Sequence, residues 1–84
     1  MIITWDEPKR LANIDKHGFD FAALSLEFFA AAVIVPAKDG RQLAIGEHNG
    51  AVIIAVVFAP LGTEALSVIS MRRADRKERS LLHD

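Results

Sequence analysis

The sequence predicts an α+β domain: an antiparallel sheet with two N-terminal helices on one face and a short C-terminal helix, in the order β-α-α-β-β-β-β-α. Apolar residues follow a helical period up to about residue 30 and a strand-like pattern from Val33 onward. Turn signals then divide the second half of the chain at Asp39-Gly40, Asn49-Gly50 and Pro60-Leu61-Gly62. Strands joined by tight turns must run antiparallel. The length of 84 residues predicts a single domain, 1–84.

The first half of the chain is expected to form a strand and two helices. Ile2–Trp5 is β-branched and aromatic, which predicts a short strand. Asp6 can cap a helix that ends near His17, before a left-handed stop at Gly18. Asp20 can cap a second helix at once. The inner stripes of these helices would consist of Leu11 and Ile14, and of Phe21, Leu24 and Phe28.

The second half is expected to form four strands and a helix. Ala51–Ala59 is almost entirely apolar, which indicates a strand in the middle of the sheet with both faces covered. Asp75 and Glu78 have the spacing of a capping box, so a short helix should begin there and end near Leu82. The other expected strands are Val33–Val35, Arg41–Glu47 and Ala65–Met71.

Composition excludes several classes of protein. The chain has no cysteine, so it can form neither a disulfide framework nor a thiolate metal site. Its three histidines, His17, His48 and His83, are scattered, and no metal or cofactor is predicted. The longest apolar run, 51–61, is too short to span a membrane. No signal peptide is recognisable at the N-terminus, and a cytoplasmic location is expected.

Positive charge is concentrated near the C-terminus. The net charge is −1, yet five of the ten Lys and Arg residues fall within residues 72–79. This pattern favours a local anionic ligand, with phosphate as the first candidate. The competing interpretation is a solvated, charged terminal helix. The five residues are Arg72, Arg73, Arg76, Lys77 and Arg79.

Motifs spread along the chain resemble the BrnT family of bacterial type II toxins. The N-terminal motif W-D-x-x-K-x-x-x-N-x-x-K-H-G-x-x-F corresponds to Trp5-Asp6, Lys9, Asn13, Lys16-His17-Gly18 and Phe21. The later motifs correspond to Arg41, Ile45-Gly46, Gly50, Ile69-Ser70-Met71-Arg72-Arg73-Ala74 and Glu78-Arg79. The resemblance implies a RelE-like fold and a ribonuclease toxin that cuts RNA without a metal. It also implies a BrnA-type antitoxin as partner, with DNA contacted only through that antitoxin.

Such chemistry requires cations, a base and an acid. The 2′-hydroxyl attacks the phosphate, so a base removes its proton, an acid protonates the leaving oxygen, and cations stabilise the phosphorane. Arg72 and Arg73 are the first candidates for the cation, because a guanidinium binds two phosphate oxygens. Side chains of adjacent strand residues point to opposite faces of a sheet, so Arg72 and Arg73 can serve one site only if the strand ends at Met71. Arg41 is a second catalytic candidate, with Asp39 as a weak base.

Other residues are candidates with competing structural interpretations. Lys38, Arg76 and Lys77 are candidate RNA-binding cations, although helix cations are commonly solvated or face a partner. His17 and His48 are candidate acid/base groups, because histidine titrates near neutral pH. For His17 the competing role is capping the carbonyl end of its helix, and for His48 it is an exposed turn position.

Several positions differ from the pattern that the family often shows. Family members often carry an arginine at the position of Ser67 and an acid at the position of Gly40. They also often have a Y-T-x-R motif that ends at the position of Leu61. A tyrosine is also common near Leu82. Lost cations weaken transition-state stabilisation. The alternative function is therefore a catalytically weakened homologue that acts as a protein- or RNA-binding module.

Overall fold

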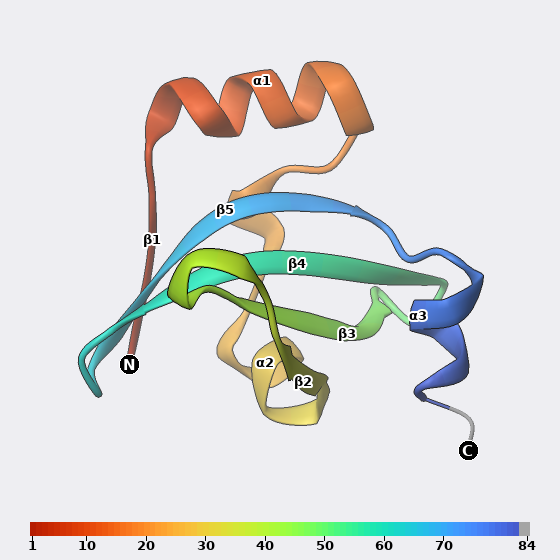
Figure 1. Ribbon diagram of the computed structural model, residues 1–84. Coiled ribbons are helices and arrows are strands. Elements are labelled where there is room, and N and C mark those ends of the chain that lie inside the picture. The colour runs from red at the N-terminus through yellow and green to blue at the C-terminus, as the bar shows by residue number, and fades with distance from the viewer. Residues whose placement is uncertain (83–84) are drawn as a thin grey trace.

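A computed structural model describes residues 1–82 and contains, within them, a five-stranded sheet and three α-helices (Figure 1). His83 lies outside the described residues, as does Asp84. The mixed α+β class is confirmed. The strands are β1 (Ile2–Trp5), β2 (Val33–Pro36), β3 (Gln42–His48), β4 (Val52–Leu61) and β5 (Ala65–Arg73). The α-helices are α1 (Glu7–His17), α2 (Leu26–Ala31) and α3 (Arg76–Ser80), and the 3₁₀ turns are η1 (Phe21–Ala23) and η2 (Lys38–Gly40).

The sheet has the strand order β1-β5-β4-β3-β2, which puts the apolar strand β4 at its centre, as expected. β2, β3, β4 and β5 pair antiparallel, but β1 runs parallel to β5, with Ile2 opposite Ala65 and Trp5 opposite Val68. The prediction of an antiparallel sheet is therefore wrong for β1. Tight turns force antiparallel pairing only between consecutive strands, and the helices, β2, β3 and β4 separate β1 from β5 along the chain.

The predicted second helix is divided in two. The Asp20 side chain accepts a hydrogen bond from the backbone N–H of Ala22 and caps only η1. The chain is extended at Leu24, and Ser25 then caps α2. This break allows Phe21 and Phe28, from two separate turns of helix, to be buried in the same core. The prediction of one continuous helix is therefore wrong: the spacing of Phe21, Leu24 and Phe28 also fits a single helix, and the cap at Ser25 was overlooked.

The two faces of the sheet are covered unequally. One face packs on Phe21, Leu24 and Phe28 and forms the main core, which also contains Ala44, Ile54, Val56, Phe58, Leu66, Val68 and Met71. The opposite face carries a smaller cluster of Ile45, Ala55 and Ala74, with Leu82 packed against it beyond α3. We call this opposite side the open face; by strand alternation it also carries Arg41, Leu43, Val57, Ser70 and Arg72.

A β-bulge decides which side chains of β5 reach the open face. Phe58 pairs with Val68 and Val57 with Ser70, so Ile69 is an extra residue in β5. The extra residue restarts the alternation, and both Val68 and Met71 therefore point into the core. Ser70 consequently lies on the open face.

Helix α1 lies along the edge of the sheet beside β5 (Figure 1). Two observations show that the expected packing of both early helices on one face is wrong for α1. Leu11, expected to face inward, is 55% exposed, whereas Asn13 is buried and contacts the backbone of Met71. With 11 residues α1 is the longest helix, and no helix within residues 1–82 is long and apolar enough to cross a membrane.

Candidate functional site at the end of strand β5

Arg72 is held on the open face by an ion pair with α3. Its Nη1 and Nη2 donate to the two carboxylate oxygens of Glu78 at 2.7 and 2.9 Å. Glu78 also accepts from the backbone N–H of Asp75 at 2.9 Å, and the Asp75 carboxylate accepts from the backbone N–H of Glu78 at 2.8 Å. The predicted capping box is confirmed, and it aims the Glu78 carboxylate at Arg72.

The pairing shifts the titration of both groups. The hydrogen bond from Arg72 lowers the pKa of Glu78, and partial burial opposes it. The hydrogen bond to Glu78 likewise raises the pKa of Arg72 above its ordinary value. Glu78 is thus a carboxylate and Arg72 a cation at neutral pH.

The guanidinium of Arg72 keeps two donors for a ligand. Of its five N–H groups, one on Nη1 and one on Nη2 bind Glu78, and the second on Nη1 points at the carbonyl oxygen of Arg73 at 3.3 Å. The remaining donors, on Nε and Nη2, lie side by side and have no partner within the described residues. Together they form the two-pronged edge that binds two phosphate oxygens.

Arg73 does not share this site. β5 extends through Arg73 instead of ending at Met71, so Arg73 points to the face opposite Arg72, where it is exposed. The condition under which both arginines would serve one site is therefore not met.

The remaining cations of this region lie on α3. Arg76 and Lys77 are exposed there. Arg79 donates from Nη1 to the carbonyl oxygen of Ala74 at 2.9 Å, which gives it a structural role at the start of the helix.

Lys38, Asp39 and Arg41 lie toward the opposite end of the sheet. Lys38 and Asp39 belong to the 3₁₀ turn η2, in which Asp39 has a left-handed backbone (φ 60°), and all three side chains are exposed. Arg41 directly precedes Gln42, which pairs with Phe58, so continuing the register by one residue brings Arg41 level with Ala59. Ala59 is four residues along β4 from Ala55, the partner of Arg72, which is about 13 Å along the strands. Arg41 shares the open face with Arg72 but would contact a different part of a bound strand.

The N-terminal motif and the end of β5 meet in a pocket between α1 and β5. The cavity measures about 290 Å³. Ser70, two residues before Arg72, lines it together with His17. The backbone N–H of Gly18, rather than the imidazole of His17, satisfies the helix carbonyl of Ile14. The full lining is Lys9, Ala12, Asn13, Lys16, His17, Ile69 and Ser70.

His48 is separate from the Arg72 site. It lies at the end of β3, where its ring meets Phe19 edge-on with centroids 6.1 Å apart, and it lines a cavity between α2 and the β3–β4 turn. By alternation it points to the core side of the sheet, like Ala44. Within residues 1–82, no three His, Asp or Glu side chains gather as a metal site would require.

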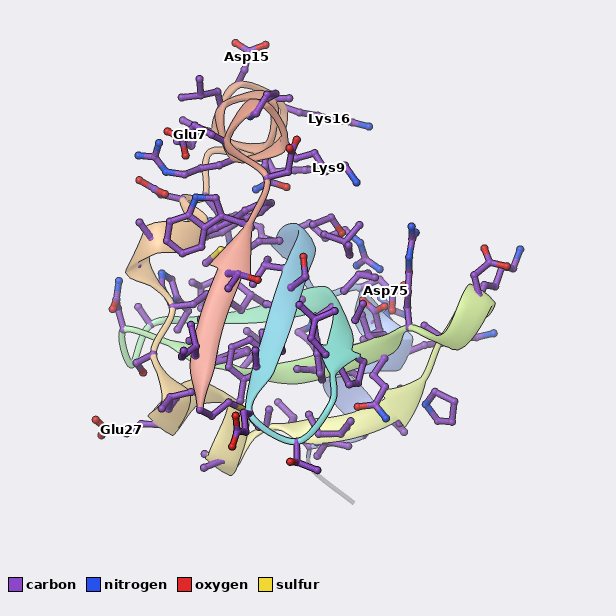
Figure 2. All side chains as sticks on the ribbon, turned by 90° about the vertical axis from the view of Figure 1, so that its left-hand side faces the viewer. Glu7, Lys9, Asp15, Lys16, Glu27 and Asp75 are labelled. Carbon is purple, nitrogen blue, oxygen red and sulfur yellow. The ribbon has the colours of Figure 1, made fainter. Side chains whose placement is uncertain are left out.

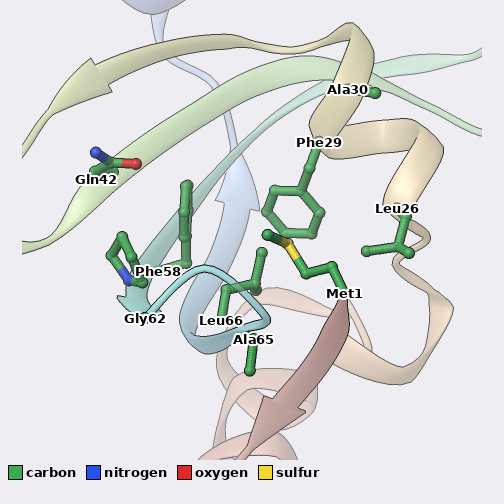
Figure 3. A pocket seen from close by; sticks show the side chains of 10 residues that line it. Met1, Leu26, Phe29, Ala30, Gln42, Phe58, Gly62, Ala65 and Leu66 are labelled. Atoms are coloured by element: carbon green, nitrogen blue, oxygen red, sulfur yellow. The ribbon is translucent and has the colours of Figure 1, made fainter.

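A further cavity is apolar and contains none of the predicted site residues. It measures about 400 Å³ and lies where Met1, α2 and the β4–β5 turn meet (Figure 3). Phe29, Phe58 and Leu66 line it. Such a lining offers neither the cations nor the acid and base that phosphate chemistry requires.

Two of the positions that differ from the family pattern, Leu61 and Ser67, lie on the open face. Ala59 pairs with Ser67, and Leu61 pairs with Ala65, on the same side of the sheet as Arg72. The arginines expected at positions 61 and 67 would therefore have lain on the open face, where this chain has a leucine and a serine.

Four residues that lie beside Arg72 or line the α1–β5 pocket were not among the predicted site residues. Glu78 was identified as a capping residue and as part of a family motif, but not as a partner of Arg72, because that contact requires the turn between β5 and α3. Lys9, Lys16 and Ser70 were noted only as parts of motifs. The helical spacing of Lys9, Asn13 and Lys16 shows that they share a face, but nothing local shows that this face meets β5.

Comparison with known proteins agrees with this fold and these motifs. The family model described as "Ribonuclease toxin, BrnT, of type II toxin-antitoxin system" matches residues 5–78. The crystal structure of the Brucella abortus ribonuclease toxin BrnT, determined at 1.1 Å, is 62% identical to this chain, with a TM-score of 0.86. The match covers 90% of this chain and 99% of that one. No curated protein matches the chain. Because the family model covers most of its length, the chain belongs to the BrnT family of ribonuclease toxins of type II toxin–antitoxin systems.

Proposed function

We propose that this chain is a metal-independent ribonuclease with a RelE-like fold, which cleaves RNA by attack of the 2′-hydroxyl on the adjacent phosphate. Its membership of a ribonuclease toxin family supports the reaction class. The observation that carries the proposal is the free two-donor edge of Arg72, held in a fixed orientation by Glu78. A cation fixed before substrate binds stabilises the phosphorane without reorganising during the reaction.

The other roles follow from position. His17 is the better placed of the two histidines for proton transfer, because it shares a pocket with Ser70, two residues from Arg72. Arg41, assisted by Lys38 and Asp39, would hold a flanking part of the RNA on the open face. Arg73, Arg76 and Lys77 would contribute to RNA binding around α3, and His48 is the weaker acid/base candidate.

The partner is proposed to be a BrnA-type antitoxin, through which alone the chain would contact DNA. Both the RNA and the antitoxin are expected in the cytoplasm. Neutralisation by a protein fits a type II toxin–antitoxin family.

Cleavage assays on Arg72 variants test the reaction. Purified protein is incubated with RNA in the presence of a metal chelator, and the products are examined for 2′,3′-cyclic phosphate ends. We expect the wild type to cut under these conditions. Arg72→Gln should lower the rate about 10²- to 10³-fold, the usual loss for one preorganised donor. Arg72→Lys, which keeps the charge but lacks the fork, should also be impaired.

The matched comparison is Arg76→Gln on α3, which removes an exposed cation proposed to contribute only to RNA binding, so it should lower the cleavage rate much less than Arg72→Gln. An Arg72→Gln variant as active as the wild type would refute the assignment, and loss of wild-type cutting with chelator would refute metal independence. Wild-type protein that binds RNA but never cuts it would instead support the alternative, a catalytically weakened binding module. Ser67 and Leu61 favour that alternative, because they leave the open face with fewer cations.

A further inference from the structure

Three residues of α1 form one stripe along the helix. Lys9, Asn13 and Lys16 are spaced by four and three residues, so they lie on the same side of α1. Figure 2 shows Lys9 and Lys16 projecting to one side of the helix, while Glu7 projects to the other and Asp15 points away from the sheet. At 1.5 Å per residue, the two lysine Cα atoms are about 10 Å apart along the helix.

The middle residue of the stripe fixes the position of both lysines. The Asn13 side chain accepts from the backbone N–H of Met71 at 3.0 Å and donates to the carbonyl oxygens of Met71 and Phe19, each at 2.9 Å. Arg10, on the same helix, donates from Nε to Asp20 at 2.8 Å. Because α1 is tied down at Asn13, Lys9 and Lys16 must flank the edge of β5 on either side of that contact.

The two lysines line the mouth of the α1–β5 pocket and are free to bind a ligand. Both are exposed, and neither forms an ion pair with any residue in 1–82. Ser70 lines the same pocket, and its hydroxyl has no hydrogen-bond partner among the described residues. Two unpaired ammonium groups beside a hydroxyl suit a phosphate or another oxyanion, which lysine binds as a point charge.

The pocket continues the surface around Arg72. Ser70 and Arg72 point to the same face of β5 and are separated by two residues, about 7 Å along the strand. A strand of RNA whose phosphate contacts Arg72 can therefore reach the pocket within a few nucleotides. Two lysines alone would bind an acidic protein segment as readily as RNA. RNA is preferred here because the pocket adjoins Arg72, the proposed phosphate-binding residue.

We propose that Lys9 and Lys16 form a second phosphate-binding site, which holds the RNA on one side of the phosphate at Arg72. The inference rests on the proposed function in that the ligand is the same RNA. It goes further in assigning α1 a part in RNA binding that is separate from the chemistry at Arg72.

The test compares the salt dependence of RNA binding between variants. The probe is a short single-stranded 2′-O-methyl RNA, which binds as RNA does but has no 2′-hydroxyl to attack. A plot of the logarithm of RNA affinity against the logarithm of salt concentration is a falling straight line. For a single strand, each phosphate that the protein neutralises adds about 0.7 to the steepness of this line. Lys9→Gln with Lys16→Gln should therefore reduce the slope by about 1.4 and weaken binding at low salt.

Two controls separate the site from general charge and from folding. Lys9→Arg with Lys16→Arg should retain the wild-type slope, because the charges remain. The double variant Ala22→Glu with Ala23→Glu changes the net charge from −1 to −3, the same change that the two glutamine substitutions cause. Its new charges lie at exposed positions on η1, away from the pocket, so this variant should change the slope much less. If the double glutamine variant does not fold, each single substitution should reduce the slope by about 0.7.

Several outcomes would overturn the inference. A glutamine variant with the wild-type slope refutes the site while leaving the proposed function intact. If RNA binding is unchanged but affinity for the antitoxin falls, the stripe contacts the protein partner instead. If the wild type itself does not bind RNA, the proposed function fails first and the second site with it.

Discussion

At the scale of single residues, Asn13 replaces a missing strand. β1 pairs with β5 only as far as Val68, so the backbone of Met71 has no strand partner on that side. The amide of Asn13 supplies both a donor and an acceptor to Met71, at a position that is only 6% exposed. Asparagine suits this position because one side chain can satisfy a backbone N–H and a backbone C=O together.

Substitution of Asn13 should destabilise the fold. Asn13→Leu would leave the N–H of Met71 and two carbonyl oxygens without partners, at about 1–3 kcal/mol for each buried group. We expect the free energy of unfolding to fall by about 3 kcal/mol or more, measured by urea denaturation. Asn13→Asp, which accepts but cannot donate, should also destabilise.

The control for this substitution is Asn49→Gly in the β3–β4 turn. Asn49 is exposed and has a left-handed backbone (φ 55°), which glycine adopts readily. The Asn49→Gly substitution should therefore change the free energy of unfolding by no more than about 0.5 kcal/mol. A comparably small change for Asn13→Leu would show that these hydrogen bonds are dispensable.

At the scale of elements, α3 is joined to β5 through one carboxylate. Glu78 closes the capping box of a helix of only five residues and also holds the guanidinium of Arg72. Helices this short are not stable alone, so the cap and the ion pair together keep α3 beside the open face. The same contacts fix the cation that the proposed reaction needs.

The Arg72–Glu78 pair predicts a pH-dependent stability. The pKa of Glu78 is lowered in the folded state, so its stabilisation is complete above its ordinary value of 4.5 and is lost as pH falls through the folded-state pKa. Glu78→Gln should lower the free energy of unfolding by on the order of 1 kcal/mol near neutral pH, and by progressively less as the pH falls below 4.5. Urea denaturation of both proteins at neutral and acidic pH measures this difference.

The matched control is Glu27→Gln on α2. Glu27 is exposed and takes part in no ion pair within residues 1–82, so its substitution should have little effect at either pH. A stability difference for Glu78→Gln that stays constant with pH would contradict the role given to its charge.

At the scale of the whole molecule, the main core and the proposed catalytic arginines lie on opposite faces of the sheet. The main core lies on one face, whereas among residues 1–82 the other face carries Arg41 and Arg72 and is covered by α3 and Leu82. A domain of 84 residues buries only roughly 60% of the surface of its unfolded chain, so its stability should be modest. Binding of a partner to the folded form would therefore have a large effect.

A BrnA-type antitoxin is expected to raise the melting temperature. A ligand that binds only the folded state, at a free concentration 100 times its dissociation constant, adds about 2.7 kcal/mol to the free energy of unfolding. For a domain of this size that corresponds to an increase of about 10 °C or more. Thermal unfolding followed across a titration with the antitoxin measures the effect, with an unrelated protein of similar charge as control. A melting temperature that does not rise with antitoxin concentration would exclude it as a partner of the folded toxin.

The candidate site was only partly predictable. The phosphate-binding role of Arg72 stays a prediction, and its separation from Arg73 depends on the continuation of β5 through Arg73. The distance of Arg41 from Arg72 depends on sheet register. The pocket beneath Lys9 and Lys16 was not foreseen, because it forms only where α1 meets β5.

The sequence by itself determined the family, the α+β class, the β3–β4 turn and the capping box of α3, because motif spacing, periodicity and capping act between residues close in the chain. Tertiary structure alone decided the parallel pairing of β1, the edge position of α1, the break before α2 and the face on which each arginine lies. These features depend on contacts such as that between Asn13 and Met71, which are 58 residues apart. Such contacts form only when burial and backbone hydrogen bonding are satisfied for the whole chain at once.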